Sequence, residues 1–163
     1  MEVSPTSMVL PEDPQALAEA TAQSMYARDD ATQALGATIV SVAPGRAQLS
    51  MTVRADMLNG HKSCHGGFIF ALADSTFAFA CNSRNVATVA SGCSIDYLAP
   101  AFLNDTLTAT AEEYSLAGRM GVYDVHVHNQ DGRKIAIFRG RSYRISGSVI
   151  AGEGVQRDPV NAK

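Results

Sequence analysis

The sequence has little cysteine, no long hydrophobic segment and no excess of basic residues. Its three cysteines cannot all pair within one chain, which favours reduced thiols in a cytoplasmic protein over a disulfide framework. No run of about 18 apolar residues could cross a membrane, and the start of the chain lacks the basic cluster of a secretory signal. The net charge of −3 argues against a nucleic-acid partner.

The composition fits one folded domain. Hydrophobic residues make up 46% and charged residues 18% of the 163 positions, so a sizeable core is possible. Both ends of the chain mix polar residues with proline, and the C-terminal end also contains glycine. We therefore expect a single domain over residues 14–147, with flexible tails at 1–13 and 148–163.

The hydrophobic periodicity changes along the chain. Residues 14–29 have a helical apolar face behind a capping Asp13, and period-two segments then flank the turn residues Pro44 and Gly45. After a loop at 55–64, the predicted elements are a long helix at 65–83 and strands at 88–97, 106–116, 121–128 and 135–145. This order predicts an α+β fold in which a long antiparallel sheet curls around a central helix, with edges open to dimerisation.

The predicted helix at 65–83 is apolar nearly all round, so protein should surround it. Asp74 lies in its middle, and burying an unpaired carboxylate is costly. A structural role, bonded to a loop or a subunit contact, is as compatible with the residue type as a functional one. The glycine-rich start of the same helix favours function.

Gly66 and Gly67 stand at that helix start. Without Cβ atoms they let another group approach the backbone closely. The N–H groups of a first turn lack partners within the helix and carry the positive end of its dipole. Such a site suits a carbonyl oxygen that gains negative charge during acyl transfer.

The spacing of Gly66 and Asp74 bears on how they could act together. Eight residues of straight helix separate them by roughly 12 Å along the axis, so one thioester carbon cannot be near both. The helix face with Gly67, Ala71, Asp74 and Ala78 is small-sided and would admit a partner. The sequence therefore predicts active sites shared between two chains.

The residues also carry a family resemblance. The segments MLNGHKSCHGGFIFALADSTFAFACNS, VASGCSIDYLAPA, DTLTATA, GVYDV and FRGRSYRI closely resemble the hotdog-fold thioesterases of bacterial phenylacetate degradation, over about residues 16–147. This resemblance implies a hotdog fold and hydrolysis of aryl- or hydroxyaryl-acetyl-CoA esters. It also implies homodimers that pair into tetramers, and no cofactor, because coenzyme A is part of the substrate.

The same resemblance assigns roles to four residues. Asp74 would be the nucleophile or the base that activates water, and the Gly66 N–H would polarise the thioester carbonyl. His65 would fix the loop or the thioester end, and Asn59 would orient water or the carboxylate across the interface. Some hotdog thioesterases have a hydroxyl one turn beyond the acidic residue, where this chain has Ala78.

Further candidates lie on the later strands. Arg139, Gly140 and Arg141 belong to a basic segment that could meet the phosphates of coenzyme A; alternatively, the charges protect a sheet edge. Ser91 could hold a water near Asp74, although a plain strand serine is the favoured interpretation. Gly67 completes the predicted substrate-binding set.

Other functions fit the sequence less well. His61, Cys64 and His65 lack a clear fourth ligand, so no metal site is expected. A hotdog hydratase or dehydratase would use a histidine as base beside the acyl chain, and His65 is the candidate. A non-catalytic acyl-CoA binding domain would keep the fold and make Asp74 structural.

Overall fold

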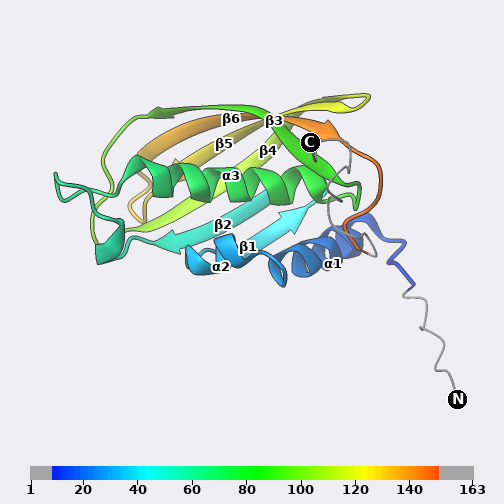
Figure 1. Ribbon diagram of the computed structural model, residues 1–163, viewed down its shortest axis with the longest axis horizontal. Helices are drawn as coiled ribbons and strands as arrows, with labels where there is room; N and C mark the ends of the chain where they lie inside the picture. The colour runs from blue at the N-terminus through cyan, green and yellow to red at the C-terminus, as the bar shows by residue number, and fades with distance from the viewer. Residues whose placement is uncertain (1–8, 151–163) are drawn as a thin grey trace, which may run out of the picture.

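A six-stranded antiparallel sheet curls around one long helix in the computed structural model, which describes residues 9–150 (Figure 1). The strand order in the sheet is β1-β2-β4-β5-β6-β3. The strands are β1 (Thr38–Ala43), β2 (Arg46–Thr52), β3 (Thr88–Tyr97), β4 (Thr106–Ala117), β5 (Met120–His128) and β6 (Lys134–Arg144). The helix at the centre is α3 (Gly66–Asn82). The predicted α+β hotdog architecture is confirmed.

The core lies between α3 and the inner face of the sheet. Along β2 every second residue is buried, which places Ala47, Leu49 and Met51 against the helix. On β6 the inward position 140 is a glycine, and a Cβ there would lie 2.8 Å from the ring of Phe77. Gly140 therefore allows α3 to approach the sheet closely, as a larger residue could not.

The N-terminal helical segment differs from the prediction. Helix α1 (Pro14–Tyr26) ends three residues before the predicted 29, and a second helix, α2 (Asp30–Ala34), follows. Helix α2 was not predicted, and it begins after Asp29 because the carboxylate of that residue accepts the Thr32 N–H at 2.9 Å. A short 3-10 turn, η1 (Ala55–Met57), lies within the predicted loop.

The predicted tails fall largely outside the described residues. The described part of the C-terminal tail, 148–150, is packed against the domain. Ile150 is buried, and its N–H donates to the Asn85 side-chain oxygen at 2.8 Å. Arg28 donates to the Val149 carbonyl oxygen at 2.9 Å. These contacts extend the folded part of the chain three residues beyond the predicted boundary.

The two edge strands of the sheet are covered differently. Helix α1 lies beside β1, where the Gln15 amide donates to the Val42 carbonyl oxygen at 2.7 Å. Strand β3 pairs with β6 on one side, and within residues 9–150 no strand pairs with its other side. Among the described residues, one long sheet edge is therefore open.

Candidate active site

Helix α3 begins at Gly66 because His65 caps it. Nδ1 of His65 accepts the Gly67 N–H at 2.9 Å and so satisfies one of the donors that a helix start leaves unpaired. Since this nitrogen accepts, a neutral His65 carries its proton on Nε2. The residue is exposed, so an Nε2–H donor is available at the helix start, whereas Nδ1 is not available as the base that a hydratase would need.

Asn59 organises the loop that leads into α3. Its side-chain oxygen accepts from the His61 N–H at 2.9 Å and from the Ser63 N–H and hydroxyl at 3.2 and 3.3 Å. The side-chain amide nitrogen donates no hydrogen bond within the described part of the chain. Any further role for Asn59 would use this amide nitrogen, since the oxygen is occupied.

The Gly66 N–H donates to no acceptor within residues 9–150, and this is the donor expected to polarise a carbonyl. The space beside the glycine is filled by the chain itself. A Cβ on residue 66 would lie 2.9 Å from the Tyr97 ring, and one on Gly67 would lie 3.1 Å from His65 Nδ1. The group that approaches the backbone at Gly66 is therefore Tyr97, whose hydroxyl donates to the Gly66 carbonyl oxygen at 2.9 Å.

Asp74 is half-buried in the middle of α3 and has little to compensate its charge. Its one hydrogen bond from the described residues is a long contact of 3.9 Å from Cys93 Sγ to Oδ1. Burial raises the pKa of Asp74, and the hydrogen bond from Cys93 acts in the opposite direction. A carboxylate in this state is more basic than a solvated aspartate, as a general base or nucleophile requires.

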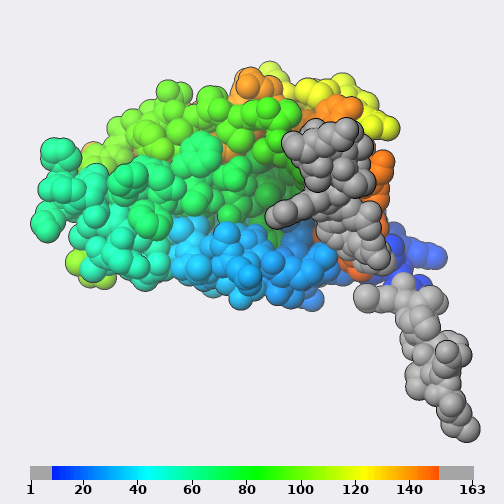
Figure 2. Space-filling view, viewed as in Figure 1, coloured from blue at the N-terminus to red at the C-terminus, as the bar shows by residue number. Residues whose placement is uncertain are grey.

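The single chain does not bring Asp74 and Gly66 together, because both lie on one straight helix. The small-sided face of α3 that was predicted to admit a partner is only partly covered by the described residues. Gly67 is exposed, and Ala71, Asp74 and Ala78 are each partly exposed. Figure 2 shows atoms of the green segment, which includes α3, at the molecular surface between the blue helices and the yellow-green strand.

The three candidates on β6 are divided between two faces of the sheet: Arg139 and Arg141 are exposed on one, and Gly140 is buried on the other. Arg139 forms a two-point ion pair with Asp124 at 2.6 and 2.7 Å and lies 5.0 Å from the centre of the Tyr114 ring. Gly140 faces α3, and the Phe77 ring occupies the space where a side chain would be. Arg141 is exposed and forms no ion pair within the described residues. Of the three, Arg141 has the guanidinium that is free to meet an anion.

Ser91 forms no hydrogen bond with Asp74 among the described residues. It occupies the bulge of β3 between Ala90 and Gly92, is exposed, and donates to the Arg141 carbonyl oxygen at 3.2 Å. Sequence reasoning missed the two β3 residues that do contact the candidate groups, Cys93 and Tyr97. Their even spacing along a strand, which puts both on one face, was the available signal.

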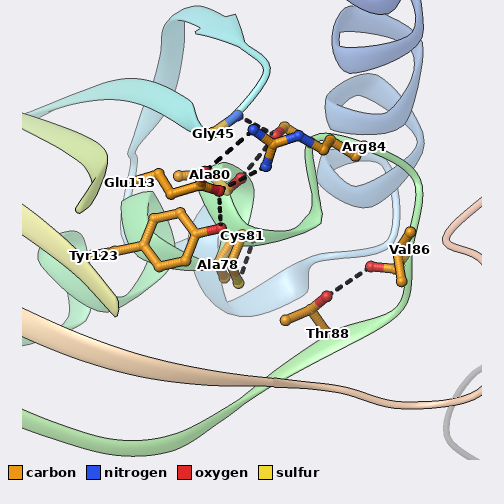
Figure 3. Close-up of polar contacts among 10 residues, drawn as sticks. Gly45, Ala78, Ala80, Cys81, Arg84, Val86, Thr88, Glu113 and Tyr123 are labelled. Atoms are coloured by element: carbon orange, nitrogen blue, oxygen red, sulfur yellow. Dashed lines mark hydrogen bonds and ion pairs between the residues drawn. The ribbon is translucent and has the colours of Figure 1, made fainter. Parts of the chain in front are cut away.

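A second polar cluster lies beyond the C-terminal end of α3 (Figure 3). The Glu113 carboxylate accepts from Arg84 at 2.6 Å and from the Tyr123 hydroxyl at 2.8 Å. Burial raises the pKa of Glu113, but the hydrogen bonds from Arg84 and Tyr123 outweigh it, so the pKa lies below its usual value. Gly45 packs against the same ion pair and donates its N–H to Ser83 Oγ at 2.8 Å.

Within residues 9–150, no three histidine, cysteine or acidic side chains are grouped so that they could hold a metal ion. Among the helices of that range, none is both long and apolar enough to span a bilayer.

Comparisons with known proteins cover most of the chain. Residues 61–136 match the family model of the thioesterase superfamily. The acyl-coenzyme A thioesterase PaaI of Escherichia coli is 52% identical over 128 residues, which are 78% of this chain and 91% of the relative. Human acyl-coenzyme A thioesterase 13 is 31% identical over 106 residues, 64% of this chain and 75% of the relative.

Solved structures give the same picture. The structure of E. coli PaaI, a protein of the phenylacetic acid degradation operon, superposes with a TM-score of 0.82 at 49% identity, covering 83% of this chain and 99% of that one. A hypothetical thioesterase of Streptococcus pneumoniae, solved with coenzyme A, superposes with a TM-score of 0.70 at 27% identity, covering 76% and 98%.

Proposed function

Because the chain belongs to the thioesterase superfamily and is an acyl-CoA thioesterase, we propose that it hydrolyses aryl- or hydroxyaryl-acetyl-CoA with Asp74 and Gly66 as its principal groups. One observation carries this assignment. The same helix presents an unpaired N–H at its start and a poorly compensated carboxylate two turns later. Thioester hydrolysis requires a donor that polarises the carbonyl and a group that either attacks the carbonyl carbon or activates water to do so.

In the proposed reaction, the thioester oxygen accepts the Gly66 N–H at the positive end of the α3 dipole. As the carbonyl carbon is attacked, negative charge grows on that oxygen and strengthens the hydrogen bond. The His65 Nε2–H, exposed at the same helix start, orients the thioester end. Asp74 of the partner subunit either attacks the carbon directly or takes a proton from the attacking water. Coenzyme A leaves as its thiolate. On the direct route the acyl group is then bound to Asp74 as an anhydride, which water hydrolyses to the free acid and the restored carboxylate.

The proposed assembly is a homodimer that pairs into a tetramer. The open side of α3 and the unpaired edge of β3 support a partner, because both expose surface that a second copy would cover. Across that interface the amide nitrogen of Asn59 orients water or the carboxylate, and Gly67 borders the thioester. A cytoplasmic location fits the three unpaired thiols of Cys64, Cys81 and Cys93.

Arg141 is the proposed contact for a phosphate of coenzyme A. It is exposed and free of an acidic partner among the described residues, whereas Arg139 is bound to Asp124. Arg141→Ala should raise KM for acyl-CoA several-fold and leave kcat nearly unchanged, since the phosphate lies far from the reacting carbon. Arg139→Ala is the matched control.

A thiol-release assay across aromatic and aliphatic acyl-CoA esters tests the substrate class. The proposal expects the highest kcat/KM for arylacetyl esters, and a preference for long aliphatic chains would contradict it. A single turnover in oxygen-18 water separates the two roles of Asp74, because label in the carboxylate requires a covalent anhydride.

Complementation tests the shared site. Asp74→Asn lacks the carboxylate, and Gly66→Pro lacks the N–H, although proline suits the first position of a helix. Mixed dimers of the two variants would contain one intact site, so an exchanged mixture should regain roughly a quarter of wild-type activity. Gly66→Ala, which adds a side chain but keeps the N–H, controls for the contact with Tyr97. No recovery on mixing would contradict a shared site.

A further inference from the structure

Strand β3 runs alongside α3 and contacts it at both candidate groups. Cys93 and Tyr97 are four residues apart and face the helix, a distance of roughly 13 Å along a strand. Gly66 and Asp74 are eight residues apart, roughly 12 Å along the helix. Because the two spacings match, Tyr97 reaches Gly66 while Cys93 reaches Asp74.

We propose that Tyr97 and Cys93 are positioning residues of the thioesterase reaction, which hold the Gly66 peptide and the Asp74 carboxylate in their working orientations. The inference rests on the proposed function, since it assumes that these two groups act on the thioester.

Tyr97 acts through the peptide group that joins Gly66 to Gly67. The carbonyl oxygen of this peptide accepts the Tyr97 hydroxyl at 2.9 Å, and its N–H donates to His65 Nδ1 at 2.9 Å. The preceding peptide carries the unpaired Gly66 N–H, and its His65 carbonyl oxygen accepts the Phe68 N–H at 3.0 Å. Because the peptide that carries the Gly66 N–H and the peptide that follows it are both held by hydrogen bonds, the direction of this N–H is fixed before substrate binds. A donor that is already oriented polarises the carbonyl most effectively.

The contact with the Tyr97 ring also explains why position 66 is a glycine. The ring lies 2.9 Å from the position of a Cβ on residue 66, closer than two carbon atoms can approach. A side chain at position 66 would therefore push Tyr97 away and release the carbonyl oxygen. Gly66→Ala should lose activity in the wild-type background and lose less in a Tyr97→Leu background, where the ring is absent.

Cys93 acts on the carboxylate itself. Its thiol is the one described hydrogen-bond donor to Asp74. Its place is set by pairing with Gly140, the glycine that seats Phe77 of α3. In addition to burial, the Asp74 carboxylate in turn raises the pKa of the Cys93 thiol and of the Cys81 thiol on α3, and the Arg141 guanidinium on β6 lowers the pKa of Cys93. Loss of the Cys93 donor destabilises the carboxylate relative to the protonated acid.

In the proposed dimer one strand thus serves two active sites. Tyr97 holds the Gly66 of one site, and Cys93 of the same strand holds the Asp74 that works in the other. The two residues should consequently have different kinetic signatures: kcat for Tyr97, and the acid limb of the pH profile for Cys93.

The test compares kcat, KM and pH profiles of the full-length variants with an arylacetyl-CoA substrate. Tyr97→Phe should lower kcat roughly three- to tenfold with KM unchanged, the effect of one neutral hydrogen bond. Tyr143→Phe, on the exposed outer side of β6, should match the wild type. Cys93→Ala should move the acid limb of kcat/KM to higher pH, and Cys93→Ser, which keeps a donor, should restore part of the shift.

An unchanged kcat in folded Tyr97→Phe overturns the role of Tyr97, and an unmoved acid limb in folded Cys93→Ala overturns that of Cys93. Asp74→Asn separates these failures from a failure of the proposed function. If Asp74→Asn is inactive while both β3 variants behave as wild type, the reaction assignment stands and only the positioning role falls. If Asp74→Asn keeps wild-type turnover, the reaction assignment itself falls.

Discussion

Asp74 and Glu113 are two carboxylates associated with the same helix, and their surroundings are opposite in character. Glu113, beyond the C-terminal end of α3, has an arginine and a tyrosine hydroxyl within hydrogen-bond distance, and its pKa is lowered. Asp74, in the middle of α3, has a thiol at 3.9 Å, and burial raises its pKa. The first arrangement stabilises the folded chain. The second costs stability, as expected of a group retained for chemistry.

Asp74→Asn gives the largest expected effect. It should lower kcat at least roughly a hundredfold, because neutral asparagine can neither attack a thioester nor take a proton from water. The melting temperature should be unchanged or higher, since a poorly compensated buried charge is removed. A thiol-release assay measures kcat, and thermal unfolding measures the melting temperature. A large fall in melting temperature would mean that Asp74, like Glu113, stabilises the fold.

Glu113→Gln should show the reverse pattern. We expect it to lower the free energy of unfolding by about 1–3 kcal/mol, because Arg84 and Tyr123 lose an ionised acceptor. Turnover per folded molecule should stay near the wild-type value. Glu112→Gln on the same strand is the matched control. Its ion pair with Arg46 is exposed on both sides, so the loss should be about 0–1 kcal/mol. Equal losses in urea unfolding would contradict the special role of Glu113.

Tyr123→Phe tests the neutral partner of the same cluster. Removing the hydroxyl that donates to Glu113 should cost about 0.5–1.5 kcal/mol, less than the loss of the ionised acceptor. In a double-mutant cycle, the double variant with Glu113→Gln should lose less unfolding free energy than the sum of the two single losses, because both substitutions remove the same hydrogen bond. Additive losses in urea unfolding would mean that the hydroxyl and the carboxylate act independently.

The smallest effect is a pH dependence of opposite sign at the two carboxylates. The stabilisation by Glu113 is present above its usual value of 4.5 and is lost as the pH falls through its lowered pKa. The cost of ionising Asp74 is present above its raised pKa and disappears as the pH falls through it towards 3.8. The melting-temperature gain of Asp74→Asn should therefore shrink on acidification. A constant gain would argue against a raised pKa.

The sequence predicted the sheet better than the loops and the N-terminal helix. The period-two pattern located β3 at its observed bounds and the other strands to within a few residues, since alternate residues must face the core. The end of α1 was placed too late, at Asp29, because an aspartate can lie inside one helix or cap the next. Only the contact of Asp29 with Thr32 shows that it is a cap. The sequence could not separate the two arginine candidates for phosphate contact, since Arg139 and Arg141 share one face of β6 and only the pairing with β5 gives Arg139 an acidic partner.

By itself the sequence determined the fold class, the central helix with its lone carboxylate, and the impossibility of joining Gly66 and Asp74 within one chain. These follow from local periodicity and helical rise, which need no knowledge of distant contacts. Only the tertiary structure decided what surrounds the two groups. The pairing of β3 with β6 brings Tyr97 to Gly66 and Cys93 to Asp74. That register arises from contacts between residues far apart in the chain, which no local pattern encodes.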